Sequence, residues 1–115
     1  MKYINLTERV VRLNDGREFF PSGIVAKVGV QFNATQHRFI PEEYADEKID
    51  LYNINKHVLD LPPEDTTGTI TYIVDIDVLE ALYPERMGDI LSPAYGHPDC
   101  VFENGEIFSV PGFVW

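Results

Sequence analysis

The sequence contains a single cysteine, Cys100, and no long apolar segment. One cysteine cannot form an intrachain disulfide, which fits a reducing compartment. The uninterrupted apolar runs are only a few residues long, too short to cross the roughly 30 Å hydrocarbon core of a bilayer. The first ten residues, MKYINLTERV, have no apolar stretch of the kind that begins a secretion signal. We therefore expect a cytoplasmic protein that does not enter a membrane.

Basic residues are also scarce. Nine Lys and Arg stand against nineteen Asp and Glu, which gives a net charge of −10. Proteins that bind DNA or RNA gain affinity by covering phosphates with Lys and Arg, so nucleic acid is not an expected partner. After Lys56 the only basic residue is Arg86. The simplest interpretation is a solvated acidic surface that maintains solubility; the alternative is a face that repels or mimics a polyanion.

Motifs that bind phosphate or metal are missing as well. None of the eight glycines belongs to a phosphate-binding loop pattern. The run His97-Pro98-Asp99-Cys100 contains residue types that bind zinc, but the chain has no paired Cys-x-x-Cys or His-x₃-His spacing. A turn around Pro98 with a buried Cys100 is the preferred interpretation, and we expect no metal and no cofactor.

Catalytic arrangements are weakly supported. Asp75 and Asp77 form a carboxylate pair, but helix capping by Asp77 and a strand-end position for Asp75 explain them more simply. Cys100 could in principle pair with a histidine, and no catalytic motif surrounds either partner. The histidines are His37, His57 and His97. We therefore expect a protein that is not an enzyme.

Most of the chain consists of short alternating or β-branched segments separated by turn residues. The dipeptides Asp15-Gly16 and Asn104-Gly105 predict tight hairpin turns, because glycine supplies the positive φ that such turns need. The segments expected to be strands are 3–7, 10–13, 17–20, 24–32, 49–54, 58–61, 69–74, 90–91, 101–103 and 106–110. The expected fold is α+β, with a mainly antiparallel sheet of six to eight strands, either open or curled into a partial barrel, in one domain covering residues 1–115.

Two segments carry further information about faces. Within residues 24–32, the even positions Ile24, Ala26, Val28, Val30 and Phe32 are all apolar and should line one face of a strand. Between residues 76 and 83 the apolar period lengthens toward 3.6, which predicts one short helix over about 77–83. Asp77 is expected to cap this helix, with Glu80 at the capping-box spacing. Pro84 should end it, because proline disfavours helical conformation in the preceding residue.

Several short motifs succeed one another in a distinctive order. They are INLT at residues 4–7, FPSG at 20–23 followed by VAKV at 25–28, LPP at 61–63 before GTITYIV at 68–74, and R..DILSP at 86–93. This order resembles a family of small proteins from phages, prophages and actinobacterial genomes, whose usual pattern runs INLTPH, PPSG-x-VARV, GLP, YIVS and Arg before D-[IVL]-L-x-P.

The resemblance runs from Ile4 to about Val110, with three departures. Glu8-Arg9 stands where the family has Pro-His, Asp75 stands where a serine is usual, and residues 32–52 do not align. The resemblance implies a phage-associated or prophage-associated context and no particular reaction.

Three residues are candidates for ligand binding. Arg86 carries a guanidinium suited to phosphate or carboxylate, and its alternatives are an ion pair with Asp89 or Glu85, or an interface contact. Tyr95, in a loop rich in proline and polar residues, is expected to be exposed and able to stack on a ligand, as is Tyr44. Arg38 is a second candidate for holding phosphate.

Two functions remain open. One is a binder that sequesters a small nucleotide-type signal of a bacterial defence system in the host cytoplasm. The other is an interaction or structural module that contacts a host protein through its acidic surface and binds no small ligand. Unpaired sheet edges and the apolar C-terminal residues 113–115 favour a homo-oligomer in either case.

Overall fold

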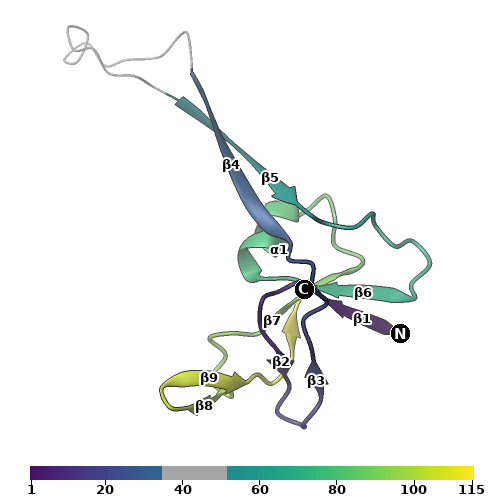
Figure 1. The fold of residues 1–115 in the computed structure, drawn as a ribbon, viewed down its shortest axis with the longest axis vertical. Helices are drawn as coiled ribbons and strands as arrows, with labels where there is room; N and C mark the ends of the chain where they lie inside the picture. The colour runs from purple at the N-terminus through teal and green to yellow at the C-terminus, as the bar shows by residue number, and fades with distance from the viewer. Residues whose placement is uncertain (35–51) are drawn as a thin grey trace, which may run out of the picture.

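The computed structural model describes residues 1–34 and 52–115, and at their centre lies a four-stranded sheet (Figure 1). Its order is β1 (Lys2–Asn5), β6 (Ile70–Ile73), β7 (Ile90–Pro93) and β10 (Phe113–Val114). β1 and β7 both pair with β6 in parallel, whereas β10 pairs with β7 in antiparallel fashion. The C-terminal residues Phe113 and Val114 thus form an edge strand of this sheet, and Trp115 after them is 77% exposed.

Three antiparallel strand pairs surround this sheet. They are β2 (Val11–Arg12) with β3 (Glu18–Phe19), β4 (Lys27–Ala34) with β5 (Tyr52–Leu59), and β8 (Val101–Glu103) with β9 (Glu106–Ser109). Gly16, Asn104 and Gly105 have positive φ, which confirms both predicted hairpin turns. In Figure 1 the β4–β5 pair, called the arm below, extends away from the central sheet.

The predicted fold class is confirmed: the described residues hold one short helix and mainly antiparallel strands, and these strands form no closed barrel. There are ten strands in the described residues instead of six to eight, because several are only two residues long. The two parallel pairings were not predicted. Parallel neighbours need a crossover connection, and the helix between β6 and β7 provides one.

The helix α1 spans Ile76–Leu82, one residue earlier than expected. Its N-cap is Asp75, with φ −69° and ψ 157° and no side-chain capping bond, so the assignment of the cap to Asp77 is wrong. Asp77 lies in the first turn, where its Oδ1 accepts a hydrogen bond from the Val78 amide at 2.8 Å. Tyr83 is extended before Pro84, as the residue before a proline tends to be, and the helix ends there.

The core lies between the central sheet, α1 and the base of the arm. Its buried members are Leu6, Ala26, Tyr72, Val74, Val78 and Ile90. Val28 and Val58, which pair with each other at the base of the arm, are partly buried and pack against this cluster. A second, smaller cluster below the β8–β9 hairpin contains Leu13, Cys100 and Val110. In the part of the chain that the structure describes, no helix has the length and apolarity needed to cross a bilayer.

A buried asparagine organises the turn after β1. Asn5 is only 2% exposed. Its Oδ1 accepts from the Thr7 amide at 2.9 Å and from the Thr7 hydroxyl at 2.7 Å. Its Nδ2 donates to the carbonyls of Arg9 and Phe19, both at 2.9 Å. One carboxamide therefore fixes the path of residues 5–9 and ties it to β3.

Asn5→Ala should lower the free energy of unfolding by about 2–4 kcal/mol, because it leaves the buried Thr7 amide without its acceptor and removes the hydrogen bonds to the Arg9 and Phe19 carbonyls. Urea denaturation at neutral pH measures the change. Asn55→Ala, on the exposed part of β5, is the matched control and should unfold like the wild type. An Asn5→Ala protein as stable as the control would show that this network does not stabilise the fold.

Candidate functional site

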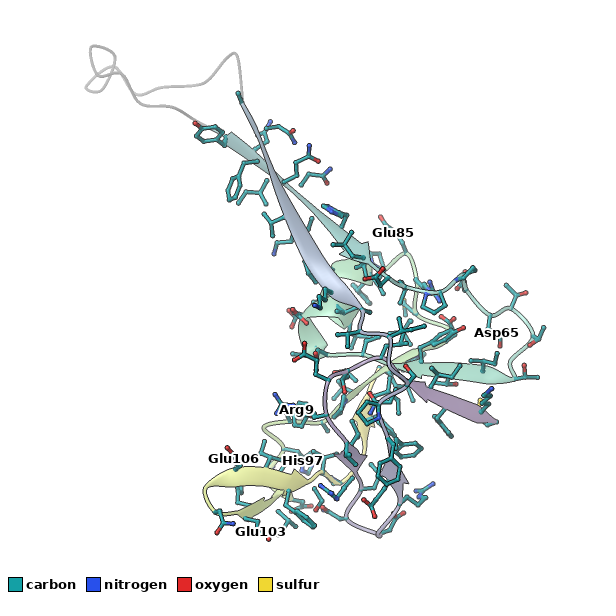
Figure 2. The ribbon with its side chains drawn as sticks, viewed as in Figure 1. Arg9, Asp65, Glu85, His97, Glu103 and Glu106 are labelled. Carbon is teal, nitrogen blue, oxygen red and sulfur yellow. The ribbon has the colours of Figure 1, made fainter. Side chains whose placement is uncertain are left out.

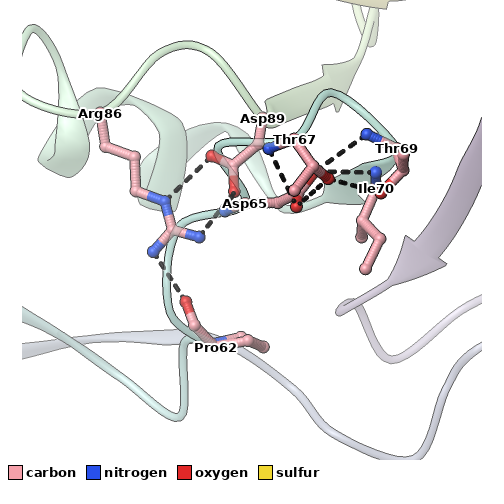
Figure 3. A network of polar contacts seen from close by, with 7 residues as sticks. All are labelled: Pro62, Asp65, Thr67, Thr69, Ile70, Arg86 and Asp89. Carbon is pink, nitrogen blue, oxygen red and sulfur yellow. Dashed lines mark hydrogen bonds and ion pairs between the residues drawn. The ribbon is translucent and has the colours of Figure 1, made fainter.

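Arg86 is largely buried, and its guanidinium bonds to Asp89 and to the Pro62 carbonyl (Figure 3). Its Nε donates to Asp89 Oδ1 at 3.0 Å and its Nη2 to Asp89 Oδ2 at 2.9 Å. Its Nη1 donates to the Pro62 carbonyl at 2.8 Å. The guanidinium also lies 5.8 Å from the centre of the Tyr72 ring. Only 13% of the Arg86 side chain and 2% of the Asp89 side chain are exposed.

Of the alternatives for Arg86, the ion pair with Asp89 is thus confirmed. The bidentate geometry uses the donor fork that a ligand phosphate would need. A role in ligand binding stays a prediction, and it would require part of this pairing to open.

The same carboxylate also holds the loop before β6. Asp89 Oδ2 accepts from the Asp65 amide at 2.9 Å, and Asp65 in turn accepts from the amides of Thr69 and Ile70 at 3.0 and 2.9 Å. Burial alone would raise the pKa of Asp89, but the hydrogen bonds from Arg86 and the Asp65 amide outweigh it, so the pKa is lowered. Asp89 is therefore held in its charged form.

Tyr95 lines a different part of the molecule, a hollow of about 800 Å³. Its side chain is partly exposed, in agreement with the expected exposure. The hollow lies between the turn after β1, the start of α1 and the β8–β9 hairpin, and Figure 2 shows Arg9 and Glu106 on this side. Its lining consists of Arg9, Val10, Arg12, Asp75, Ile76, Tyr95, Glu106, Ile107 and Phe108.

The third candidate, Arg38, lies outside the described residues, as do Tyr44 and His37. Arg86 does not line the hollow that contains Tyr95. It borders a smaller apolar one of about 110 Å³ beside Tyr83 and Trp115. The structure therefore does not bring Arg86 and Tyr95 together.

The charged groups around the hollow influence one another. Burial raises the pKa of Asp75, nearby Asp77 adds to this effect, and Arg9 opposes it. Burial likewise raises the pKa of Tyr95, and Arg9 again opposes the shift. Arg9 is therefore within electrostatic reach of both groups, although its side chain is exposed.

The second arginine of the hollow is positioned from two sides. Arg12 Nε lies 3.1 Å from Glu18 Oε2 on the paired strand β3. Its guanidinium carbon lies 4.9 Å from the centre of the Phe108 ring, within the range of a cation–π contact. Both contacts are partly exposed, so the guanidinium retains access to the hollow.

The hollow combines three kinds of recognition group. Two guanidinium groups can donate to an anion, two carboxylates can accept from amino or imino groups, and Tyr95 and Phe108 offer ring surfaces for stacking. Its volume falls in the range of small-molecule sites, about 300–1,000 Å³. Sequence reasoning missed Arg9, although this residue occupies the Glu8-Arg9 position where the resembled family has Pro-His.

The sulfur and imidazole groups near residue 97 have structural partners. His97 Nδ1 accepts from the Asp99 amide at 3.0 Å, and the buried Cys100 thiol donates to the Ala94 carbonyl at 3.3 Å. This confirms the turn around Pro98 with a buried Cys100. Among the described residues, no group of three or more His, Cys, Asp or Glu side chains is arranged to hold a metal ion.

Comparison of the chain with protein-family models, with curated proteins and with solved structures finds no match. The resemblance to phage and prophage proteins therefore stays a prediction based on motif order. The function of the chain is therefore inferred from the geometry of the hollow and of the Arg86 network.

Arg86→Ala should lower the free energy of unfolding by about 3–5 kcal/mol, because it leaves the Asp89 carboxylate buried without its cation. Chemical denaturation at pH 7 measures the loss. Arg17→Ala is the control, since the Arg17–Asp15 pair is well exposed and its removal should leave the midpoint almost unchanged.

The pH dependence distinguishes this cause from a simple loss of packing. In the wild type the pKa of Asp89 lies below its ordinary value of 3.8, so its stabilisation is present above that pH and is lost as the pH falls through the lowered pKa. In Arg86→Ala the influence of Arg86, which lowers the pKa of Asp89, is lost while the burial that raises it remains, so this pKa should rise and protonation should become less costly to the folded variant. The difference in free energy of unfolding between variant and wild type should narrow as the pH falls from 7 to 4. A difference that stays constant with pH would contradict the idea that the variant is destabilised by a buried, unpaired carboxylate.

Proposed function

We propose that this protein binds and sequesters a small nucleotide-type ligand, without altering it, in the hollow between Arg9 and Tyr95. The observation that carries the proposal is the grouping of two arginines, two carboxylates and two aromatic rings around one space of about 800 Å³. Arg9 and Arg12 take the phosphate-binding role that the sequence suggested for Arg86 and Arg38.

A nucleotide fits this set better than a simple anion does. Its phosphate accepts hydrogen bonds from the guanidinium groups, and its ring can stack on Tyr95 or Phe108. Its amino and imino groups donate to carboxylates such as Asp75 and Glu106, which would repel a bare anion. The lining thus matches a ligand with an anionic end and a donor-bearing aromatic end.

The charge distribution supports the same site. The chain as a whole carries −10, which disfavours anions in general. The charged residues that line the hollow are two arginines and two acids, so their formal charges cancel. An anion would therefore meet less repulsion here than over the rest of the acidic surface.

Binding without turnover is the chemistry that these residues favour. The lining formed by the described residues contains donors, acceptors and rings but no cysteine, histidine, serine or lysine that could act as a nucleophile at neutral pH. Together with the motif order shared with phage and prophage proteins, this supports sequestration of a signalling nucleotide made by a bacterial defence system. Such a protein would act in the cytoplasm of the bacterial host.

A panel of linear and cyclic nucleotides tests the proposal by thermal shift and calorimetry, with inorganic phosphate as the reference. At least one nucleotide should raise the melting temperature, because a ligand that binds only the folded state stabilises it. Arg9→Ala should weaken that affinity at least tenfold, and Tyr95→Phe, which keeps the ring, should weaken it less than Tyr95→Ala.

The matched control is Arg17→Ala, which removes an exposed arginine from outside the hollow and should leave the affinity unchanged. Recovery of the ligand unaltered after binding, checked by chromatography, distinguishes sequestration from catalysis. If no nucleotide in the panel shifts the melting temperature, or if Arg9→Ala and Arg17→Ala bind equally well, the hollow is not a nucleotide site.

A further inference from the structure

The arm has two chemically different faces. In an antiparallel pair, residues directly opposite each other lie on the same face, and successive pairs alternate between faces. One face carries the pairs Val28–Val58, Val30–Lys56, Phe32–Ile54 and Ala34–Tyr52. The other carries Lys27–Leu59, Gly29–His57, Gln31–Asn55 and Asn33–Asn53. The first face is therefore almost entirely apolar, and the second is mostly polar.

Among the described residues, the core covers the apolar face only at its base. Val28 and Val58 pack against the core, but farther along the arm the side chains are open to solvent. Val30 is 48% exposed, Tyr52 55%, Ile54 59% and Phe32 64%. The Phe32 and Tyr52 rings contact each other edge to face, with centroids 6.4 Å apart, so they form one patch.

An uncovered two-stranded ribbon of this kind gains little from its own chain. Such a pair is marginally stable in water unless a face packs against something else. Contiguous exposed apolar patches on otherwise polar proteins typically mark interaction surfaces. The outer part of the arm therefore fits a partner that covers Phe32, Tyr52 and Ile54.

Charge indicates what that partner is. β4 and β5 contain two lysines, Lys27 and Lys56, and no acid. The described residues outside these strands, 1–26 and 60–115, hold five basic and fourteen acidic residues, a net charge of −9. A second copy of the chain thus offers a strongly acidic body to a basic, apolar arm.

A groove beside the arm offers a place for this contact. It has a volume of about 380 Å³ and is lined by Val28, Val30, Lys56, Asp77, Glu80 and Ala81. The apolar side of the groove is continuous with the exposed face of the arm, and its acidic side is formed by α1. Apolar and acidic surfaces that could receive an arm thus lie side by side.

We propose that two copies of this chain associate through their arms, the apolar face of each arm packing into the groove beside the other's α1. A two-fold arrangement makes the contact self-complementary and closed. The four exposed apolar side chains supply on the order of 100 Å² each. This is about half of the roughly 800 Å² per partner that stable interfaces bury, so the groove has to contribute the rest.

Light scattering during size-exclusion chromatography, together with sedimentation velocity across a concentration series, tests the proposal on the full chain. The wild type should be dimeric at micromolar concentration. Phe32→Ser combined with Ile54→Ser should raise the dimer dissociation constant at least tenfold. Gln31→Ser combined with Asn55→Ser alters the opposite face of the same strands and should leave it unchanged.

Charge reversal provides a second readout that does not depend on the apolar substitutions. Lys56→Glu should weaken the dimer, high salt should weaken the wild-type dimer by screening the attraction, and Glu80→Lys added to Lys56→Glu should restore the affinity in part. Circular dichroism confirms that each variant is folded. A monomeric wild type at about 100 micromolar, or a dimer as tight in the Phe32→Ser, Ile54→Ser variant as in the polar-face control, would overturn the proposal, and a monomer would assign the patch to a different partner.

Discussion

The buried contact between Arg86 and Asp89 is the interaction on which the central sheet depends. Asp89 directly precedes β7, and its carbonyl accepts from the Tyr72 amide of β6 at 2.7 Å. Its carboxylate holds Arg86 just beyond α1 and the Asp65 amide before β6. Parallel strands cannot be joined by a tight turn, so their register relies on contacts at the ends of the crossover. A single desolvated carboxylate makes those contacts here, which explains why the most conspicuous arginine of the acidic half serves the fold.

This structural use of Arg86 separates it from the arginines available for a ligand. Arg9 reaches the hollow because the Asn5 carboxamide bonds the Arg9 carbonyl and fixes the preceding turn. Arg12 reaches it because β2 pairs with β3 and places the guanidinium beside Phe108. In both cases the backbone of the arginine is held in place by hydrogen bonds, while its side chain remains partly exposed. Burying a charge has a desolvation cost. For Arg86 the hydrogen bonds of its guanidinium offset this cost, whereas Arg9 and Arg12 are more exposed and incur less of it.

Local signals in the sequence predict much of the fold, and distant contacts account for the remainder. Asp15-Gly16, Asn104-Gly105 and Pro84 act through their own backbone preferences, so the two hairpins and the helix end are accessible from the sequence. The pairing of β1 with β6 joins residues about seventy positions apart, and no local pattern encodes it. The hollow assembles residues from four separate segments for the same reason, which is why the sequence points to Tyr95 without Arg9. Capping-box spacing likewise does not distinguish Asp77 from Asp75 as the helix cap.

The even-position pattern of residues 24–32 correctly predicts one apolar face, and the meaning of that face changes along the strand. At Ala26 and Val28 the face lies on the core, whereas at Val30 and Phe32 the same alternation continues into solvent. An alternation of apolar and polar residues indicates that one face of a strand packs against something, but it does not identify what covers that face. The apolar face carries one lysine, Lys56, and both strands lack acids while nineteen lie elsewhere in the chain, a distribution suited to a contact with an acidic surface. The acidic residues Asp77 and Glu80 of α1 form a surface of that kind beside the arm, which is the charge pattern that the proposed dimer would use.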